Sequence, residues 1–280
     1  MSEAGLRVIF RDDGVLHDIS DKVADFLDGQ YATVDFDAGD DDALFIGSDL
    51  PFNQKFFLIT TGNNSVSQIL IDTWWGNSWQ RSVDVFDRTK DGDSKSMKQS
   101  GYVSFSPEWD KGWHRENFSK DVPGLSGTEI YNRYWTRLTW SESFTGTNAA
   151  RIQYIGHKFC SDNDIFSEYP DLDSNAIRTA FKAGKTNWED QILVASQAVV
   201  SDLQRRDIIW TDNQILDFRK FRYPALHKAA ALIYRGMGRA YYEQADRSEG
   251  LYQKAMSMKN YHVDLNQDGK LDPGEKMIQT

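Results

Sequence analysis

The chain has 280 residues, of which 40% are hydrophobic and 13% are aromatic. This length favours two domains, and the apolar content is sufficient to bury cores, so a disordered protein is excluded. The formal net charge of −10 argues against nucleic acid as a direct partner, because phosphate binding needs a basic surface.

Two features that the sequence lacks limit the class of protein further. Cys160 is the single cysteine, so no intramolecular disulfide can form. The N-terminal residues show no cationic stretch followed by an apolar run, and no window approaches the ~20 apolar residues of a membrane span. We therefore expect no secretory signal, no membrane partner, and synthesis in a cytoplasm with release by lysis at most.

Residues 1–158 are predicted to form an antiparallel β-sandwich or jelly roll. Short runs of period 2 are bounded by Gly, Asn, Asp and Pro, without intervening helical patterns. Gly76-Asn77 has the composition of a tight hairpin turn. The expected strands are 6–10, 31–36, 43–46, 55–60, 67–75, 78–86, 101–106, 132–140 and 149–155.

Aromatic residues are concentrated in this β-rich half. In the strand 132–140, alternation places one set of side chains toward the core and the other toward water: Tyr134, Leu138 and Trp140 against Arg133, Arg137 and Thr139. We expect most tryptophan rings to be buried or used in protein contacts, with stacking on sugars as the alternative.

Residues 159–262 are predicted to form an α-helical domain, because the apolar period changes to 3.6. Thr186 and Glu189 have capping-box spacing, ahead of an apolar stripe that runs from Trp188 to Leu203. Pro224 suits the first turn of a helix that continues to Tyr241. Shorter helices are expected at 171–181 and 250–260, and 208–221 is either a strand or an irregular packed segment.

Residues 263–280 are predicted to form a C-terminal arm with an EF-hand-like calcium loop. Oxygen-bearing groups fall at every ligand position of such a loop, and Gly269 stands where the chain must turn sharply. The predicted ligands are Asp264, Asn266, Asp268, Lys270 through its backbone carbonyl, Asp272 through water, and Glu275. The alternative is a solvated acidic tail. Because no second loop and no full exiting helix follow, we expect a structural ion rather than a sensor.

No constellation of residues predicts catalysis. The five histidines lie in unlike contexts, and the sequence has no zinc-protease, nucleophile-elbow or Walker pattern. Cys160 near His157 is expected to be a buried small residue rather than a nucleophile. The acidic runs at 35–42 and 162–173 are expected to be solvated, since glycoside hydrolysis needs two carboxylates placed in a cleft. The sequence therefore predicts a protein that is not an enzyme.

Several segments resemble structural proteins of tailed bacteriophages. Residues of the first half resemble a β-sandwich of such proteins: Leu44–Ile59, the hairpin Trp74–Trp79 and Ser100–Phe105. Residues of the second half resemble the helical head-to-tail connector adaptors of the phage neck: Ala176–Phe181, the helix with Trp188, and Phe218–Pro224 leading into an alanine-rich helix. The β domain departs from a minimal adaptor, which lacks such an addition.

The resemblance implies a virion protein of the phage neck that forms a dodecameric ring and joins the portal of the capsid to the tail. Its partners would be its own copies, the portal protein, and a downstream neck or tail-terminator protein. Residues 254–280 would be the portal-contacting arm. Genome DNA would pass through the ring without sequence-specific contacts.

Two other functions fit the same sequence. A β-sandwich rich in tryptophan, joined to a calcium loop, is typical of a calcium-dependent carbohydrate-binding module, with Trp75 and Trp79 as the stacking rings. Another tail or baseplate structural protein would share most of the features of the neck protein.

Overall fold

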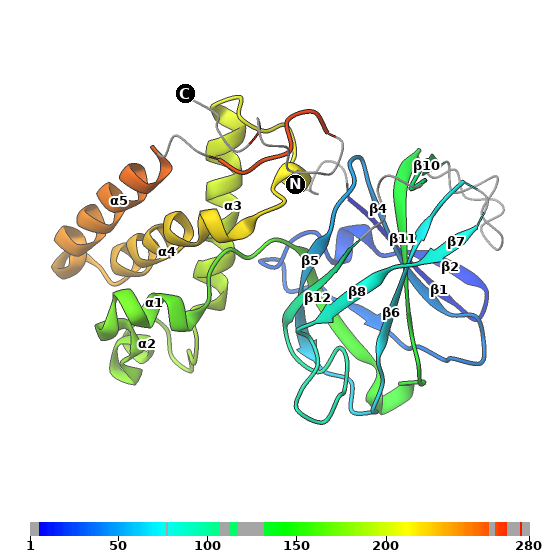
Figure 1. The fold of residues 1–280 in the computed structure, drawn as a ribbon. Helices are drawn as coiled ribbons and strands as arrows, with labels where there is room; N and C mark the ends of the chain where they lie inside the picture. Colours follow the sequence, from blue (N-terminus) through cyan, green and yellow to red (C-terminus); the bar gives the residue numbers. More distant parts are fainter. Residues whose placement is uncertain are drawn as a thin grey trace. The chain divides into compact units, whose positions relative to one another are not determined.

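The computed structural model describes residues 6–76, 78–106, 112–116, 132–257, 261–267 and 275. The protein is α+β, as the sequence predicts: antiparallel strands occupy the N-terminal part and the α-helices follow them (Figure 1). Contacts divide the chain into two compact units, which we call the β unit (1–156 with 267–269) and the helical unit (157–266 with 270–280).

The first sheet of the β unit is antiparallel and has the strand order β2-β1-β4-β11-β6-β7, with β10 paired to β11. Its strands are β1 (Arg7–Asp12), β2 (Val15–Asp18), β4 (Ala43–Ser48), β6 (Ile69–Trp74), β7 (Trp79–Arg81), β10 (Arg115–Glu116) and β11 (Arg133–Trp140). Strand β11 therefore lies centrally, although the sequence places it near the end of the unit.

The second sheet is also antiparallel, with the order β3-β12-β5-β9-β8. Its strands are β3 (Ala32–Val34), β5 (Gln54–Thr61), β8 (Val83–Asp87), β9 (Gly101–Ser106) and β12 (Ala150–Gly156).

Both sheets contribute to one hydrophobic core. The first sheet supplies Val8, Leu44, Ile71 and Leu138, and the second supplies Val34, Phe57, Val103 and Ile152. Each set comes from alternate positions of its strands, which is the period-2 pattern that the sequence shows. Burial of this shared face stabilises the β unit by about 25 cal/mol per Å² of apolar surface removed from water.

The opposite face of the first sheet is partly covered by protein. The prediction for 132–140 was that this face is exposed to water. Trp135, whose side chain alternates with the core-facing ones, is fully buried in a second apolar cluster with Phe45 and Trp74. Arg137 on the same face stacks over the ring of Trp79, 5.1 Å from its centroid. The prediction was wrong here because alternation shows which residues share a face, not whether that face is covered.

The predicted strand 78–86 is divided between the two sheets. β7 pairs with β6 in the first sheet, whereas β8 pairs with β9 in the second. The chain changes sheets around Ser82, whose N–H donates to Ile71 O at 2.8 Å. Asp84, with φ of 54°, accommodates the change of direction.

The hairpin of β1 and β2 was missed from the sequence. Its turn is Asp13-Gly14, with φ of 49° and 76°, which is the left-handed geometry of a type I′ turn. Asp13-Gly14, between the apolar runs 8–10 and 15–16, was the available signal.

The helical unit contains α1 (Asp162–Glu168), α2 (Asn175–Phe181), α3 (Glu189–Arg205), α4 (Arg222–Gly236) and α5 (Tyr242–Met256). Helices α4 and α5 lie side by side (Figure 1), and α3 packs on α4. Their buried stripes form a single core: Ile192, Val199 and Leu203 of α3, Leu226, Ala230 and Ile233 of α4, and Ala245 and Tyr252 of α5.

Two predicted helix boundaries in this unit are wrong. The predicted helix from Pro224 to Tyr241 ends at Gly236, and Gly238, with φ of 95°, turns the chain toward α5. The last helix then begins at Tyr242, so Gly250 lies inside it. Gly236 and Gly238 thus mark the end of α4.

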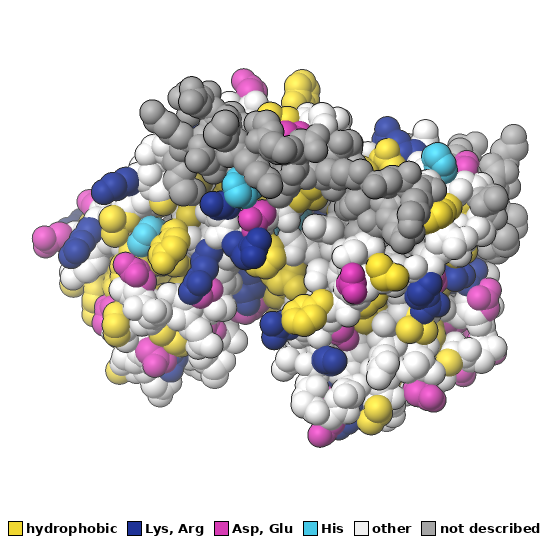
Figure 2. All heavy atoms as spheres, in the orientation of Figure 1, with side chains coloured by type: hydrophobic (Ala, Val, Ile, Leu, Met, Phe, Trp, Pro, Cys, Tyr) yellow, Lys and Arg dark blue, Asp and Glu magenta, His cyan; other side chains and the backbone are white. Residues whose placement is uncertain are grey.

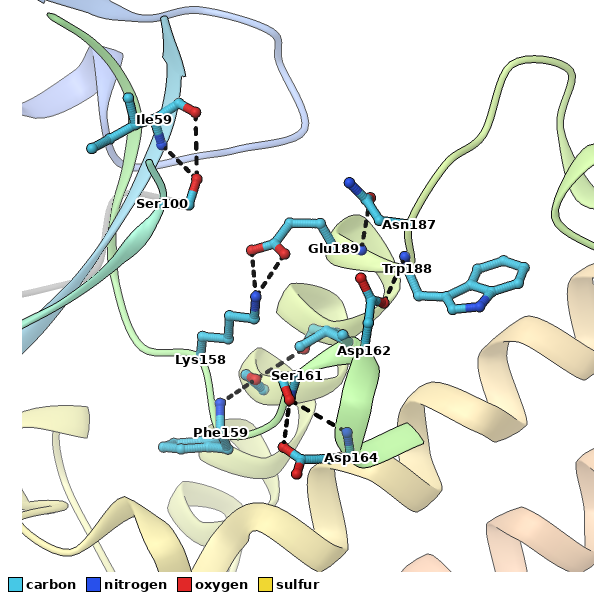
Figure 3. A network of polar contacts seen from close by, with 12 residues as sticks. Ile59, Ser100, Lys158, Phe159, Ser161, Asp162, Asp164, Asn187, Trp188 and Glu189 are labelled. Carbon is cyan, nitrogen blue, oxygen red and sulfur yellow. Dashed lines mark hydrogen bonds and ion pairs between the residues drawn. The ribbon is translucent and has the colours of Figure 1, made fainter. Parts of the chain in front are cut away.

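The capping box predicted at Thr186 is not the N-terminus of α3. The N-cap is Trp188, and Glu189 N instead donates to Asn187 Oδ1 at 3.2 Å (Figure 3). Trp188 N donates to Asp162 Oδ1 at 2.9 Å, which ties α3 to α1. Helix α1, missed from the sequence, has the capping box Ser161–Asp164.

The predicted helix 171–181 begins as a 3-10 turn, Pro170–Asp173, and becomes α-helical only at α2.

On the face drawn in Figure 2, acidic and basic side chains are interspersed with hydrophobic ones. Among the described residues, no helix has both the length and the apolar character needed to cross a membrane.

Candidate metal centre

The stretch 208–221 forms the platform on which the C-terminal segment lies. From the sequence, this stretch could be either a strand or an irregular packed segment. It is irregular, with the 3-10 turns Asp212–Gln214 and Phe218–Phe221. Ile209, Ile215 and Phe221 are buried in the helical core. A non-helical stretch of this kind leaves backbone groups available for a second segment to pair with.

Residues 261–264 lie on that platform (Figure 1). Tyr261 and Val263 are buried in the helical core, and the Tyr261 ring stacks on Phe221 with 6.1 Å between centroids. Arg206 Nη1 donates to Met256 O at 2.5 Å, and the Tyr261 hydroxyl donates to the same carbonyl. The segment that leads into the predicted calcium loop is therefore anchored by apolar packing.

Asp264, the first predicted ligand, is fixed by Gln214. Its backbone N–H donates to Gln214 O at 2.8 Å, and its carbonyl accepts from Gln214 Nε2 at 2.7 Å. Asp264 is 0% exposed. Gln214 was not singled out from the sequence, although Thr211-x-x-Gln214 has the capping-box spacing that the structure confirms.

Glu275, the last predicted ligand, folds back onto the start of the loop. Its Oε1 accepts the N–H of Leu265 at 2.8 Å and the N–H of Asn266 at 3.0 Å. The side chain is 6% exposed. These hydrogen bonds bring Glu275 onto the backbone of Leu265 and of the predicted ligand Asn266, which follow the predicted ligand Asp264 in the chain. Asp268, Lys270 and Asp272 lie outside the described residues.

The donor chemistry of this segment fits a hard divalent cation. Carboxylate and amide oxygens are the ligands that calcium prefers. Burial of a carboxylate is costly unless its charge is compensated, and a divalent cation would add to the compensation that two backbone N–H groups give Glu275.

A neighbouring ion pair lies outside the predicted ligand set. His262 Nδ1 lies 3.3 Å from Asp217 Oδ2, and Arg219 Nε lies 2.8 Å from Asp217 Oδ1. Burial alone would raise the pKa of Asp217, but hydrogen bonds from Arg219 and His262 bring it below its usual value. Asp217 is therefore held as the carboxylate that joins 208–221 to 261–264.

A second acidic group lies in the β unit, where carboxylate oxygens of Asp12, Asp13 and Asp42 fall within 4.8 Å of one another. Asp42 is buried, contrary to the expectation of a solvated run at 35–42. Its oxygens accept the backbone N–H of Asp13 at 2.9 Å and of Asp37 at 2.8 Å. Burial raises the pKa of Asp42. The group is accounted for by its role in holding two turns together.

Cys160 is buried, as expected from the sequence. Burial, followed by the nearby Asp164, raises the pKa of its thiol. The thiolate, which is the reactive form, is therefore disfavoured at neutral pH. His157 lies with Nε2 2.9 Å from Asp212 Oδ2.

The tryptophan rings of the β unit are mostly engaged inside it. Trp74, Trp113, Trp135 and Trp140 are buried. Trp79 is half-buried between Trp74 and Phe45, with ring centroids at 5.3 and 5.7 Å. Trp75, also half-buried, donates from Nε1 to Thr73 Oγ1 at 3.2 Å. Both proposed sugar-stacking rings are thus partly buried and contact other groups of the β unit.

Comparisons of the chain with protein-family models, with curated proteins and with solved structures return no match.

Proposed function

We propose that this chain is a structural protein of a tailed-phage neck, which forms a ring between the portal of the capsid and the tail. The proposal starts from the resemblance of its segments to sandwich and connector proteins. In the structure, the residues of the first resemblance fall on β4, β5, β6, β7 and β9. Those of the second fall on α2, α3 and the entry to α4.

Within this proposal the β unit is a two-sheet sandwich of jelly-roll type, and the helical unit is a separate connector domain. One core shared by two antiparallel sheets supports the sandwich. A second core confined to helices and the segments around them supports a separate helical domain.

The observation that carries the proposal is the composition of the exposed surface of the helical unit. Trp210, Tyr223 and Tyr242 are 83%, 58% and 48% exposed. Exposed arginine side chains occur in the same unit: Arg205, Arg219, Arg222 and Arg235. Tryptophan, tyrosine and arginine are the residues enriched at the energetic centres of protein interfaces. A protein that works by adhesion to its copies and to the portal would present such a surface.

We further propose that the loop from Asp264 to Glu275 binds calcium as a structural ion. The burial of both end carboxylates supports this site. Bound calcium would preshape the C-terminal arm, so that less ordering entropy opposes docking on the portal. The acidic net charge suits a conduit whose wall does not retain DNA.

The test of the neck function is assembly with the portal protein of the same virus. In sedimentation velocity with calcium and the portal protein, we expect the sedimentation coefficient of the 32.1 kDa monomer to be replaced by that of a portal-bound ring. Trp210→Ala with Tyr223→Ala should weaken this assembly at unchanged melting temperature. Val66→Ser, which removes an exposed apolar side chain of the β unit, is the matched control. A chain that stays monomeric with both portal and calcium present would contradict the proposal.

A further inference from the structure

Gln214 has every polar group of its side chain engaged, although it is a neutral residue with no place in the predicted ligand set. It is 1% exposed. Its Nε2 donates to Asp264 O at 2.7 Å, while its Oε1 accepts the N–H of Trp210 at 2.6 Å and of Thr211 at 3.2 Å. One planar amide therefore joins two segments that are about fifty residues apart in the sequence.

On one side of this amide lies the start of the cation loop. Asp264 is bonded to Gln214 twice, through its N–H and through its carbonyl. The next two residues, Leu265 and Asn266, donate their N–H groups to the Glu275 carboxylate. A cation that draws Asp264 and Glu275 together must therefore act on the backbone that Gln214 holds.

On the other side lies Trp210, which is 83% exposed. Its backbone is fixed at both polar groups, because its N–H donates to Gln214 Oε1 and its carbonyl accepts from Gln204 Nε2 at 3.1 Å. An exposed ring on a fixed backbone costs little entropy when a partner binds it. The strength with which the backbone is held therefore affects how readily the Trp210 ring binds a partner.

The amide plane makes the two sides dependent on each other. Nε2 and Oε1 belong to one rigid group, so a displacement of the Asp264 carbonyl that moves Nε2 also moves the acceptor of the Trp210 and Thr211 N–H groups. Buried hydrogen bonds of this kind strengthen one another. By linkage, the coupling free energy between the two sides is the same in both directions: the effect of cation binding on the Trp210 side equals the effect of fixing the Trp210 side on cation binding.

We infer that Gln214 is a positioning residue that couples the cation loop to Trp210, so that cation binding at Asp264 and Glu275 fixes the backbone beneath the exposed ring. The inference rests on the proposed calcium site and adds its regulatory consequence. Trp210 is held firmly when the ion is bound and more loosely when it is removed.

The test is hydrogen exchange of the full-length protein in calcium and in chelator, read separately at two sets of amides. The loop set is Leu265 and Asn266, and the ring set is Trp210 and Thr211. We expect calcium to slow exchange at both sets in the wild type. Calcium that slows the loop set alone overturns the coupling but leaves the calcium site standing. Calcium that slows neither set overturns both.

Two variants separate coupling from a merely structural role. Gln214→Met removes both ends of the amide, and we expect calcium to protect the loop set but no longer the ring set, with calcium binding roughly tenfold weaker. Gln214→Glu keeps the acceptor and loses the donor, and it serves if the methionine variant fails to fold. We expect the same protection of its ring set with and without calcium. A full calcium response at the ring set in either folded variant overturns the inference.

Gln204→Ala is the matched control, because it removes the other hydrogen bond to Trp210 without touching the loop. We expect faster exchange around Trp210 with the calcium response of the ring set retained. Loss of that response in Gln204→Ala would assign the coupling to the Trp210 carbonyl rather than to Gln214, and would overturn the proposal.

Discussion

Asp72 and Arg137 face each other across β6 and β11, with Arg137 Nη2 at 2.8 Å and Nε at 3.0 Å from Asp72 Oδ2. On the other side of Asp72, Arg81 Nε lies 2.6 Å from Oδ1. One buried carboxylate of β6 thus binds an arginine from each of the two strands that flank β6 in the sheet. Arg137 in turn covers the ring of Trp79. This arrangement ties β7, β6 and β11 together on the face of the sheet opposite the main core.

Replacing Asp72 by alanine should destabilise the β unit by about 1–3 kcal/mol, because it removes the hydrogen bonds that a buried carboxylate accepts from two partly exposed arginines. Urea unfolding measures the loss. Asp93→Ala, which breaks an exposed pair with Lys95, is the matched control and should change stability by less than about 1 kcal/mol. Equal effects of the two substitutions would show that the Asp72 bridge contributes nothing special.

Gly47→Ala should cost about 1–3 kcal/mol by overpacking. Gly47 pairs with Trp135 in the register of β4 and β11, and an added Cβ would lie 2.5 Å from Trp135 Cζ3. Gly92→Ala, where a Cβ meets nothing within 4 Å, provides the comparison. The difference in free energy of unfolding between these two variants is the measurement.

Gly250→Ala should stabilise the helical unit by about 1 kcal/mol. Gly250 lies inside α5 on its exposed side, and an added Cβ there meets nothing within 4 Å. Alanine has the higher helix propensity by this amount. Thermal unfolding should show a higher melting temperature, whereas a lower one would mean that the glycine serves a contact of the folded protein.

Acid should weaken the helical unit partly through His227. Burial lowers the pKa of this buried histidine, with Glu168 acting in the opposite direction, and its Nδ1 lies 2.8 Å from the Tyr169 hydroxyl. Because the unfolded chain binds the proton more readily, the contribution is complete above the unfolded pKa of about 6.5 and is lost as pH falls toward the folded value. Unfolding at pH 7.5 and 5.5 should show a smaller acid loss in His227→Gln.

Calcium should raise the melting temperature of the helical unit if the loop binds it. At one hundred times the dissociation constant the gain in stability is about 2.7 kcal/mol. Asp264→Asn or Glu275→Gln should abolish this gain. Asp13→Asn, in the acidic group of the β unit, should preserve it. A gain that survives both loop substitutions would place the ion elsewhere.

Local patterns in the sequence predict most elements, because strand and helix periods depend on residues that are near each other. Asp13-Gly14 and Ser161-x-x-Asp164 carried signals for β2 and α1 that could have been read. The glycines at 236 and 238 likewise marked the end of α4.

Other features depend on residues far apart and leave no local trace. The burial of Trp135 requires a second covered face, and the transfer of the chain from β7 to β8 requires both sheets to be in place. At the candidate site, the spacing predicts Asp264 and Glu275 as ligands. It does not identify Gln214, whose partner is fifty positions away.

The location of Cys160 has a practical consequence. Since this single thiol is enclosed by the helical core, a cysteine engineered onto the surface would react alone with a maleimide dye. A fluorescent dye can therefore be attached at one chosen site without first removing the native cysteine.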